Sequence, residues 1–261
     1  MKVSNSQIGC FKACRRMYEL KYIHGLEPVE KPEALSRGLS YHEAVERILR
    51  HETDEGLELE PKVRAMAKRF AKSFHLTVDA VEQWFEYNTQ SGHTVIGRVD
   101  ATVAHAHTVV EHKTTGSSID GAYFQRLEFD EQIPTYMLGM NVNDVVYTVC
   151  QTPTIRQKKN ETDEEFEERC IAWFDEPSAD GKKFAIETIH KTPEQLELFA
   201  AGQDAVINEM ANCRLFYRNP SHCMKWGRLC EYASICMHYD PNMEYIEFKR
   251  REIRGNGNSD A

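Results

Sequence analysis

The stretch GRVDATVAHAHTVVEHKTT, residues Gly97 to Thr115, decides the fold of this chain. Two segments that overlap it, HTVIGRVDATVAH and HTVVEHKTT, are rich in β-branched residues and alternate with period two. A similar segment, VEQWFEYNT, precedes them and is followed by the polar turn SGH. Short β-rich segments separated by polar turns are typical of antiparallel sheets. The stretch therefore predicts an antiparallel meander of three strands.

Two acids and a lysine interrupt this apolar pattern. In a strand over Val109 to Lys113, Glu111 and Lys113 are two residues apart and point to the same face. A turn around residues 105–108 would bring Asp100, on the preceding strand, beside Glu111. Carboxylates that converge repel each other, and a divalent cation is the usual remedy. Beside such a cation, Lys113 could orient water or stabilise a developing charge, which suits phosphodiester hydrolysis.

The alternative is that these are ordinary strand residues at the surface. Asp100 and Glu111 would then pair with Lys113 and Arg98, and so short a pattern arises by chance in many sequences. Two further features favour a site. His42 lies in the helical segment RGLSYHEAVERIL, where an imidazole could add a ligand. Gln132 and Tyr136, in QIPTY, share one face of a helix that follows the Glu-x-Lys strand.

The rest of the chain alternates between helical and extended patterns. Apolar spacing predicts helices over residues 4–25, 32–51 and 61–74 before the meander. After it come a helix over 119–141, a strand over 145–152, an acidic helix, a strand at KFAIETIH and a long helix that TPEQ opens. This order favours a mixed α/β layer.

Composition sets outer limits on function. The 261 residues are 41% apolar and 28% charged, which are globular values. No stretch approaches the roughly 20 apolar residues of a membrane span, and the N-terminus has no apolar signal segment, so we expect no membrane and a cytoplasmic location. The net charge of −9 disfavours a nucleic-acid partner. The segment from Pro61 to His75 nevertheless has five bases and no acid, which leaves a local phosphate footprint open.

Four motifs occur in a fixed order along the chain: Gly-x-x-x-His, Gly-x-x-Asp, Glu-x-Lys and Gln-x-x-x-Tyr. Together they resemble the PD-(D/E)XK nucleases, above all the RecB-like branch that includes CRISPR-adaptation exonucleases and phage-encoded relatives. The likeness runs from about Ser6 to Cys236. One departure is that no proline precedes the lead acid in GRVD. The resemblance implies a restriction-endonuclease-like mixed sheet flanked by helices.

The same resemblance implies the domain layout and the site. It implies one nuclease domain over 1–261, with a helical N-terminal part (1–75), a catalytic sheet core (76–192), a C-terminal helix and cysteine cluster segment (193–240) and a tail (241–261). Mg²⁺ or Mn²⁺ would be bound by His42, Asp100, Glu111 and the His112 backbone carbonyl. Lys113 would be the catalytic lysine, and Gln132 and Tyr136 would position it or the DNA strand.

The cysteines indicate a second site. Cys223, Cys230 and Cys236 lie within CMKWGRLCEYASIC, and clustered thiols in a reducing compartment more often bind metal than form disulfides. Three thiols are one too few for a closed site. Cys14, in CRRMY, resembles the first iron-sulfur ligand of RecB-like nucleases, with arginine in place of proline. The resemblance thus implies a 4Fe-4S clasp, with Cys10 as an alternative first ligand and zinc as an alternative metal.

The sequence leaves two classes of function. The first is a Mg²⁺- or Mn²⁺-dependent DNA exonuclease for recombination, repair or end processing, acting on single strands or duplex ends with a possible helicase, recombinase or integrase partner. The second is a catalytically idle DNA-binding or assembly subunit that keeps the fold and the clasp. An intact set of His, Asp, Glu and Lys favours the first.

Overall fold

The computed structural model describes residues 1–30, 32–53, 56–103, 107–225 and 227–251. The chain divides into two compact units. Unit 1 comprises Met1–Lys31, Glu86–Gly97 and Glu197–Ala261, and unit 2 comprises Pro32–Phe85 and Arg98–Leu196. The sequence-based layout of one domain in four consecutive parts stays a prediction.

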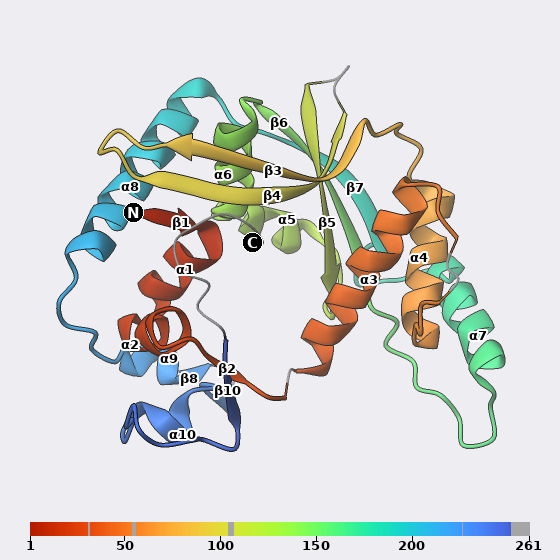
Figure 1. Cartoon of the computed structure of the whole chain (residues 1–261). Coiled ribbons are helices and arrows are strands. Elements are labelled where there is room, and N and C mark those ends of the chain that lie inside the picture. The colour runs from red at the N-terminus through yellow and green to blue at the C-terminus, as the bar shows by residue number, and fades with distance from the viewer. Residues whose placement is uncertain (31, 54–55, 104–106, 226, 252–261) are drawn as a thin grey trace. The chain divides into compact units, whose positions relative to one another are not determined.

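Helices and strands are interspersed along the described residues (Figure 1). The first part contains β1 (Lys2–Ser4), α1 (Asn5–Ala13), α2 (Arg15–Tyr18), the π-helix η1 (Glu19–Ile23), β2 (Leu26–Pro28), α3 (Glu33–Leu49) and α4 (Pro61–Ser73). The middle contains β3 (Ala80–Asn88), β4 (Thr94–Val103), β5 (Thr108–Thr115), α5 (Gly121–Leu127), α6 (Gln132–Met140) and β6 (Asp144–Gln151). The last part contains α7 (Asp163–Asp175), β7 (Phe184–His190), α8 (Pro193–Asn212), α9 (Pro220–Cys223), β8 (Met224–Lys225), β9 (Arg228–Leu229), α10 (Ala233–Cys236) and β10 (Phe248–Arg250).

The main sheet is mixed, as the predicted fold class requires. Its strand order is β1-β4-β5-β6-β7, and β3 pairs with β4. In unit 1, β1 runs parallel to the first residues of β4. In unit 2, β4 and β5 are antiparallel, β5 and β6 parallel, and β6 and β7 antiparallel. The meander is therefore confirmed for β4 and β5, while the turn predicted around residues 105–108 includes residues 105 and 106, which lie outside the described residues.

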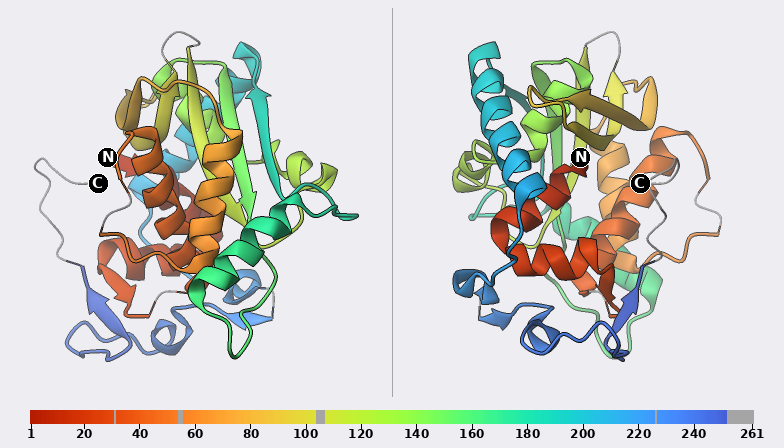
Figure 2. Two further views of the ribbon diagram at one scale, coloured as in Figure 1. Left: turned by 90° about the vertical axis from the view of Figure 1, so that its right-hand side faces the viewer. Right: turned by 60° about the vertical axis from the view of Figure 1, so that its left-hand side comes forward.

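Helices α3, α4 and α7 cover one face of the sheet in unit 2 (Figure 2). Their buried side chains form one apolar cluster with alternate residues of β4, β5 and β6, among them Tyr41, Phe70, Val110, Val146 and Trp173. On the other face, α6 buries Ile133 and Met137. The period-two alternation of the strands thus gives one face to the helix pack and the other to α6 and the acidic residues.

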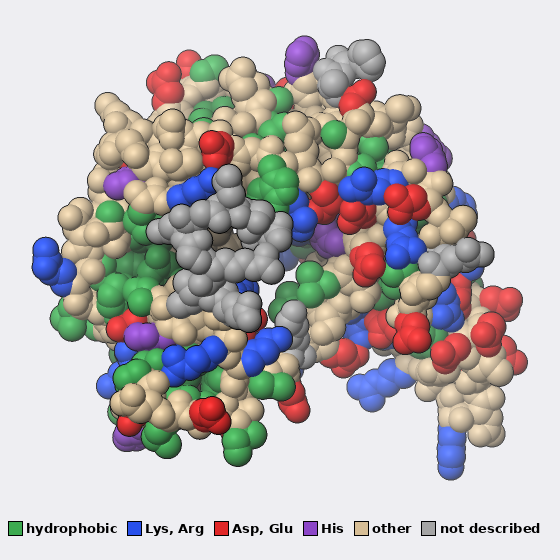
Figure 3. Space-filling view, viewed as in Figure 1, with side chains coloured by type: hydrophobic (Ala, Val, Ile, Leu, Met, Phe, Trp, Pro, Cys, Tyr) green, Lys and Arg blue, Asp and Glu red, His purple; other side chains and the backbone are tan. Residues whose placement is uncertain are grey.

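The basic segment Pro61–His75 is not a free cationic surface. Four of its five bases, Arg64, Lys68, Arg69 and Lys72, form ion pairs with Glu167 or Asp175 of α7. Figure 3 accordingly shows acidic and basic side chains interspersed on the side where these helices lie. The bases of α4 join two helices, so the phosphate footprint that the sequence left open there is not supported.

Two predicted helices are interrupted. The helix expected over 4–25 breaks at Cys14, whose backbone is extended (φ −162°, ψ 114°). The break is fixed by distant contacts, since the Arg16 amide donates to the Tyr217 carbonyl. The helix expected over 119–141 is two helices, α5 and α6. Their junction lies beside the candidate site.

Unit 1 has its own apolar core. A capping box between Ser4 and Gln7 starts α1, and α1 packs with α8 through residues such as Ile8 and Ile207. The segment near the C-terminus returns to the start of the chain: β10 pairs antiparallel with β2, and the Tyr232 hydroxyl donates to the Leu26 carbonyl. In the described ranges, no helix combines the length and apolar character that crossing a lipid bilayer requires.

Candidate active site

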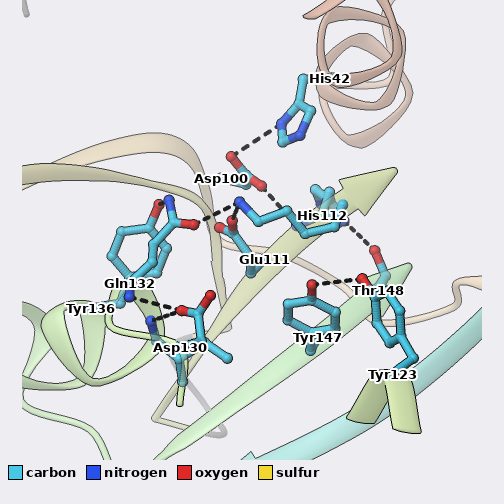
Figure 4. A network of polar contacts seen from close by, with 12 residues as sticks. His42, Asp100, Glu111, His112, Tyr123, Asp130, Gln132, Tyr136, Tyr147 and Thr148 are labelled. Carbon is cyan, nitrogen blue, oxygen red and sulfur yellow. Dashed lines mark hydrogen bonds and ion pairs between the residues drawn. The ribbon is translucent and has the colours of Figure 1, made fainter. Parts of the chain in front are cut away.

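Asp100 and Glu111 lie next to each other in unit 2, as the hairpin predicts. Ala101 faces Val110 in the antiparallel register of β4 and β5, which makes Asp100 and Glu111 the next pair along. The His112 amide donates a hydrogen bond of 2.8 Å to Asp100 Oδ2. Figure 4 shows both carboxylates converging on one region between the strands and α6.

Glu111 is the most deeply buried acid of the group. Only 1% of it is exposed, and Lys113 Nζ forms an ion pair with its Oε1. Its Oε2 is buried and has no hydrogen-bond partner among the described residues. Burial, then the charge of Asp100, raises the pKa of Glu111 to about 8, although Lys113 opposes the shift. Near neutral pH and without a cation, Glu111 is therefore mostly protonated.

Asp100, by contrast, is ionised near neutral pH. Burial disfavours its charge, but hydrogen bonding and charge from His42, together with the His112 amide, outweigh burial and hold the pKa of Asp100 at about 2. His42, from α3, places Nδ1 3.4 Å from Asp100 Oδ1. This pairing also raises the pKa of His42 against the effect of burial. The two carboxylates thus share one proton, as close acidic pairs do.

Lys113 connects the strand to α6. Its Nζ donates a 2.7 Å hydrogen bond to Gln132 Oε1, and Gln132 Nε2 donates to the Tyr136 hydroxyl at 2.6 Å. Burial lowers the pKa of Lys113, but Glu111, with the charges of Asp100 and Asp130, outweighs burial and raises the pKa, so the ammonium group stays charged. Gln132 and Tyr136 share the helix face that the sequence predicted. The catalytic and positioning roles of these residues stay predictions.

His112 turns its ring away from this group. The imidazole is buried on the helix-pack face, edge to face with Phe70 at 4.9 Å, and Nδ1 is 2.7 Å from Thr148 Oγ1. Burial lowers the pKa of His112 to about 4, so the ring is neutral. Only its backbone faces Asp100. The ligand role expected of its carbonyl stays a prediction.

Asp130 fixes the start of α6 and is not among the residues predicted from sequence. Its Oδ1 accepts hydrogen bonds from the amides of Gln132 (2.8 Å) and Ile133 (3.0 Å). These hydrogen bonds cap the first turn of α6. They fix where the loop after α5 ends and in which direction Gln132 projects. An Asp just before a helical segment is a typical cap, so the signal was present in the sequence.

Tyr147 and Tyr123 extend the site on the side of β6 and α5. Tyr147 lies opposite Glu111 in the parallel register, and its hydroxyl is 3.0 Å from that of Tyr123. Figure 4 shows this pair beside Glu111. These tyrosines are not among the residues predicted from sequence, because their position depends on which strand pairs with β5.

The donor set suits a hard divalent cation. Two carboxylates, a nearby imidazole and the unpartnered Oε2 of Glu111 are the oxygen and nitrogen donors that Mg²⁺ or Mn²⁺ accepts. Within the described ranges, no three His, Cys, Asp or Glu side chains are arranged around a common ion position. The fit therefore rests on the chemistry of the donors and on the free oxygen.

The predicted iron-sulfur ligands all lie in unit 1. Cys14 Sγ accepts the Asn219 amide at 3.4 Å, and Cys223 Sγ donates to the Asn219 carbonyl at 3.4 Å. Burial raises the pKa of Cys230 and of Cys236, and the charges of Cys14 and Cys223 raise both further. The described thiols form no metal-binding group. The arrangement does not support the predicted cluster.

Comparison with known proteins identifies the family. The profile of the PD-(D/E)XK nuclease superfamily matches residues 2–79 and 57–237. The chain belongs to this superfamily. Its mixed sheet flanked by helices is consistent with the restriction-endonuclease-like fold of this superfamily. No curated protein matches this nuclease by sequence.

Three solved structures are similar to this chain at low sequence identity. A candidate exonuclease from Eubacterium rectale is 12% identical with a TM-score of 0.55, covering 93% of this chain and 90% of its own. A phage-related exonuclease from Haemophilus somnus 129PT is 13% identical with a TM-score of 0.36, covering 74% and 92%. The protein SSO0001 is 14% identical with a TM-score of 0.41, covering 82% and 79%. The first of these supports the fold.

Proposed function

We propose that this protein is a Mg²⁺- or Mn²⁺-dependent DNA exonuclease that acts in recombination, repair or end processing. The observation that carries the proposal is the buried Asp100–Glu111 pair with a charged Lys113 beside it. A fold needs no such group for stability, because burying ionisable side chains costs free energy. The exonuclease names of two structural relatives agree with this activity.

The residues divide the work of phosphodiester cleavage. Asp100, Glu111 and His42, with the His112 carbonyl, would hold the cation. When bound, it would activate water and neutralise charge on the phosphate. Lys113 keeps its proton and would donate a hydrogen bond to a phosphate oxygen as negative charge develops there. Gln132 would fix the orientation of the Lys113 ammonium group, and His42 would keep Asp100 ionised.

End-labelled DNA tests the proposal. Linear and closed circular DNA, single- and double-stranded, would be incubated with Mg²⁺ or Mn²⁺ and the parent protein, Lys113→Ala or the control Lys182→Ala. Lys182 also pairs with a glutamate, Glu187, but lies at the surface. We expect the parent and the control to degrade linear DNA, and Lys113→Ala to lose at least 100-fold in rate, the order of one removed charge-stabilising donor.

The competing function is a catalytically idle DNA-binding or assembly subunit. If the folded parent cuts no substrate with either metal, this function becomes the better account. The unpartnered Oε2 of Glu111 favours an active site, since an idle scaffold would gain stability by replacing the glutamate. A helicase, recombinase or integrase partner, a cytoplasmic location and a single RecB-like domain belong to the same proposal.

The 4Fe-4S cluster is a separate part of the proposal and rests on the sequence pattern of Cys14, Cys223, Cys230 and Cys236. The four cysteines lie in one unit, and the Asn219 backbone contacts both Cys14 and Cys223. Protein purified without oxygen would be assayed for iron, sulfide and visible absorbance. Stoichiometric zinc without iron would show a zinc site, and neither metal would show four structural thiols.

A further inference from the structure

An aromatic and cationic stripe leads outward from the candidate active site. Tyr123 and Arg126 are three residues apart on α5, and Phe129 follows three residues later. The Phe129 amide donates to the Arg126 carbonyl, so the helical turn continues past α5, and side chains spaced by three lie in one row. The Arg126 guanidinium lies 5.4 Å from the centre of the Tyr123 ring.

The inner end of this stripe touches the catalytic strands. The Tyr123 hydroxyl lies 3.0 Å from that of Tyr147, the neighbour of Glu111 across β5 and β6. At the outer end, Phe129 directly precedes Asp130, which caps the helix that carries Gln132. The stripe therefore begins beside Glu111 and ends at the loop that leads into α6 and Gln132.

The outer side chains are exposed although their backbone is fixed. Phe129 is 86% exposed. Around it, Leu127 is buried, Glu128 pairs with the buried Lys191, and Asp130 accepts two amides of α6. A single exposed apolar residue is ordinary on a protein surface. An aromatic ring held out on a rigid loop beside an active site is suited to contact a ligand, because little conformational entropy is lost on binding.

Arg126 gives the stripe its charge. It is exposed, and within the described part of the chain it has no acidic partner. The bases of α4, by contrast, are neutralised by α7. On a protein with net charge −9, an exposed guanidinium that lies over the Tyr123 ring and three residues before Phe129 suits alternating bases and phosphates.

We propose that Tyr123, Arg126 and Phe129 bind the single-stranded end of the DNA substrate next to the scissile phosphate. The rings would stack on bases and Arg126 would contact the phosphate between them. Intact duplex DNA presents no free base faces, so the stripe selects a single-stranded end. This inference rests on the proposed function for its substrate.

The test measures binding without cleavage. A fluorescein-labelled oligothymidylate and a blunt duplex of equal length would be titrated in EDTA and followed by anisotropy. The proteins are the parent, Phe129→Ala, Arg126→Ala and two controls that alter exposed side chains elsewhere, Leu198→Ala and Arg156→Ala. Circular dichroism and thermal melting would confirm that each variant is folded.

We expect Phe129→Ala to weaken binding of the single strand roughly 5- to 100-fold, the effect of losing one stacked base. Arg126→Ala should lower the slope of log affinity against log salt by about 0.7, one phosphate contact on a single strand. Duplex affinity and both controls should change less than about twofold. Equal losses on single strand and duplex, or variants indistinguishable from the controls, would overturn the inference.

A parallel cleavage assay separates this inference from the proposed function. A parent that cuts linear DNA while both stripe variants bind and cut normally refutes the stripe alone. A parent that cuts nothing, yet binds the single strand through Phe129 and Arg126, refutes the nuclease activity and supports the stripe as a single-strand binding site. Absence of single-strand binding by the parent refutes the stripe.

Discussion

Asp100 and Glu111 are adjacent acids in opposite protonation states, and this difference predicts unequal effects of two similar substitutions. Asp100 is charged and hydrogen-bonded, so Asp100→Asn should lower the free energy of unfolding by about 2 kcal/mol at pH 7. Its depressed pKa stabilises the fold above the unfolded value near 4, and that contribution is lost as pH falls towards 2. Glu111→Gln replaces a mostly neutral acid and should cost less. Urea denaturation in EDTA measures both.

The same acids predict a pH dependence with a defined sign. The pKa of Glu111 is raised to about 8, so between its ordinary value of 4.5 and 8 the folded protein binds more protons than the unfolded chain. Stability contributed by this residue therefore falls as pH rises through that window. The difference in unfolding free energy between Glu111→Gln and the parent should therefore shift in favour of the variant as pH rises from 5 to 8. A constant difference over this range would contradict the assigned protonation states.

Local pattern was enough to predict some residues of the site and not others. The two-residue repeat of a strand predicted that Glu111 and Lys113 share one face, and the hairpin predicted Asp100 beside Glu111. Helical spacing predicted that Gln132 and Tyr136 share a face. Tyr147 was beyond such reasoning, because its contact with Glu111 requires β6 to pair parallel with β5. That pairing depends on a connection of many residues, which the alternation of side chains does not encode.

At the scale of elements, the packing of α6 against β3 depends on a missing side chain. A Cβ at Gly139 would overlap the ring of Phe85, which is buried. Gly139→Ala should therefore lower the unfolding free energy by about 1–3 kcal/mol, as overpacked cores do. Gly9, within α1, has nothing within 4 Å of the same position, so Gly9→Ala should stabilise by up to about 1 kcal/mol.

Thermal and urea denaturation of both variants would measure these two changes in unfolding free energy, which have opposite signs. Adding Phe85→Leu to Gly139→Ala should restore part of the loss, since the smaller side chain leaves room for the methyl group. If Gly139→Ala is as stable as the parent, the close contact between α6 and Phe85 is not present in solution.

Helix type was predictable from sequence, whereas helix ends often were not. The amphipathic pattern of α4 gave Pro61–Ser73 nearly to the residue. The breaks at Cys14 and before α6 depend on contacts made elsewhere: the Tyr217 carbonyl for the first and the Asp130 carboxylate for the second. Apolar spacing continues through both breaks, so periodicity alone joined the pieces.

For the whole molecule, the proposed cation site predicts stabilisation by mass action. At ten times its dissociation constant, a cation that binds only the folded state raises the unfolding free energy by about 1.4 kcal/mol. Thermal melting with increasing Mg²⁺ or Mn²⁺ should show this rise for the parent and for Lys182→Ala. Glu111→Gln and Asp100→Asn should show much less, and an equal response from all four proteins would place the cation elsewhere.

The fold class was predictable for the whole chain, but the sheet order was not. Alternating helical and extended patterns were enough to predict a mixed α/β layer. Strand β1 has three residues and no alternation long enough to detect, although it pairs with β4. Charge counted along the sequence was also a poor guide to the surface. The basic segment of α4 seemed free in sequence, but in the folded chain most of its bases form ion pairs with α7.

The pairing of β10 with β2 has a consequence for biosynthesis. Unit 2 has all its residues once Leu196 has been added, whereas unit 1 needs the strand Phe248–Arg250 to complete its second sheet. On the ribosome, the residues that surround Asp100 and Glu111 can therefore fold before the cysteine segment has emerged. Strand β2 must wait for residues 248–250, so this sheet of unit 1 is complete only after unit 2 can form.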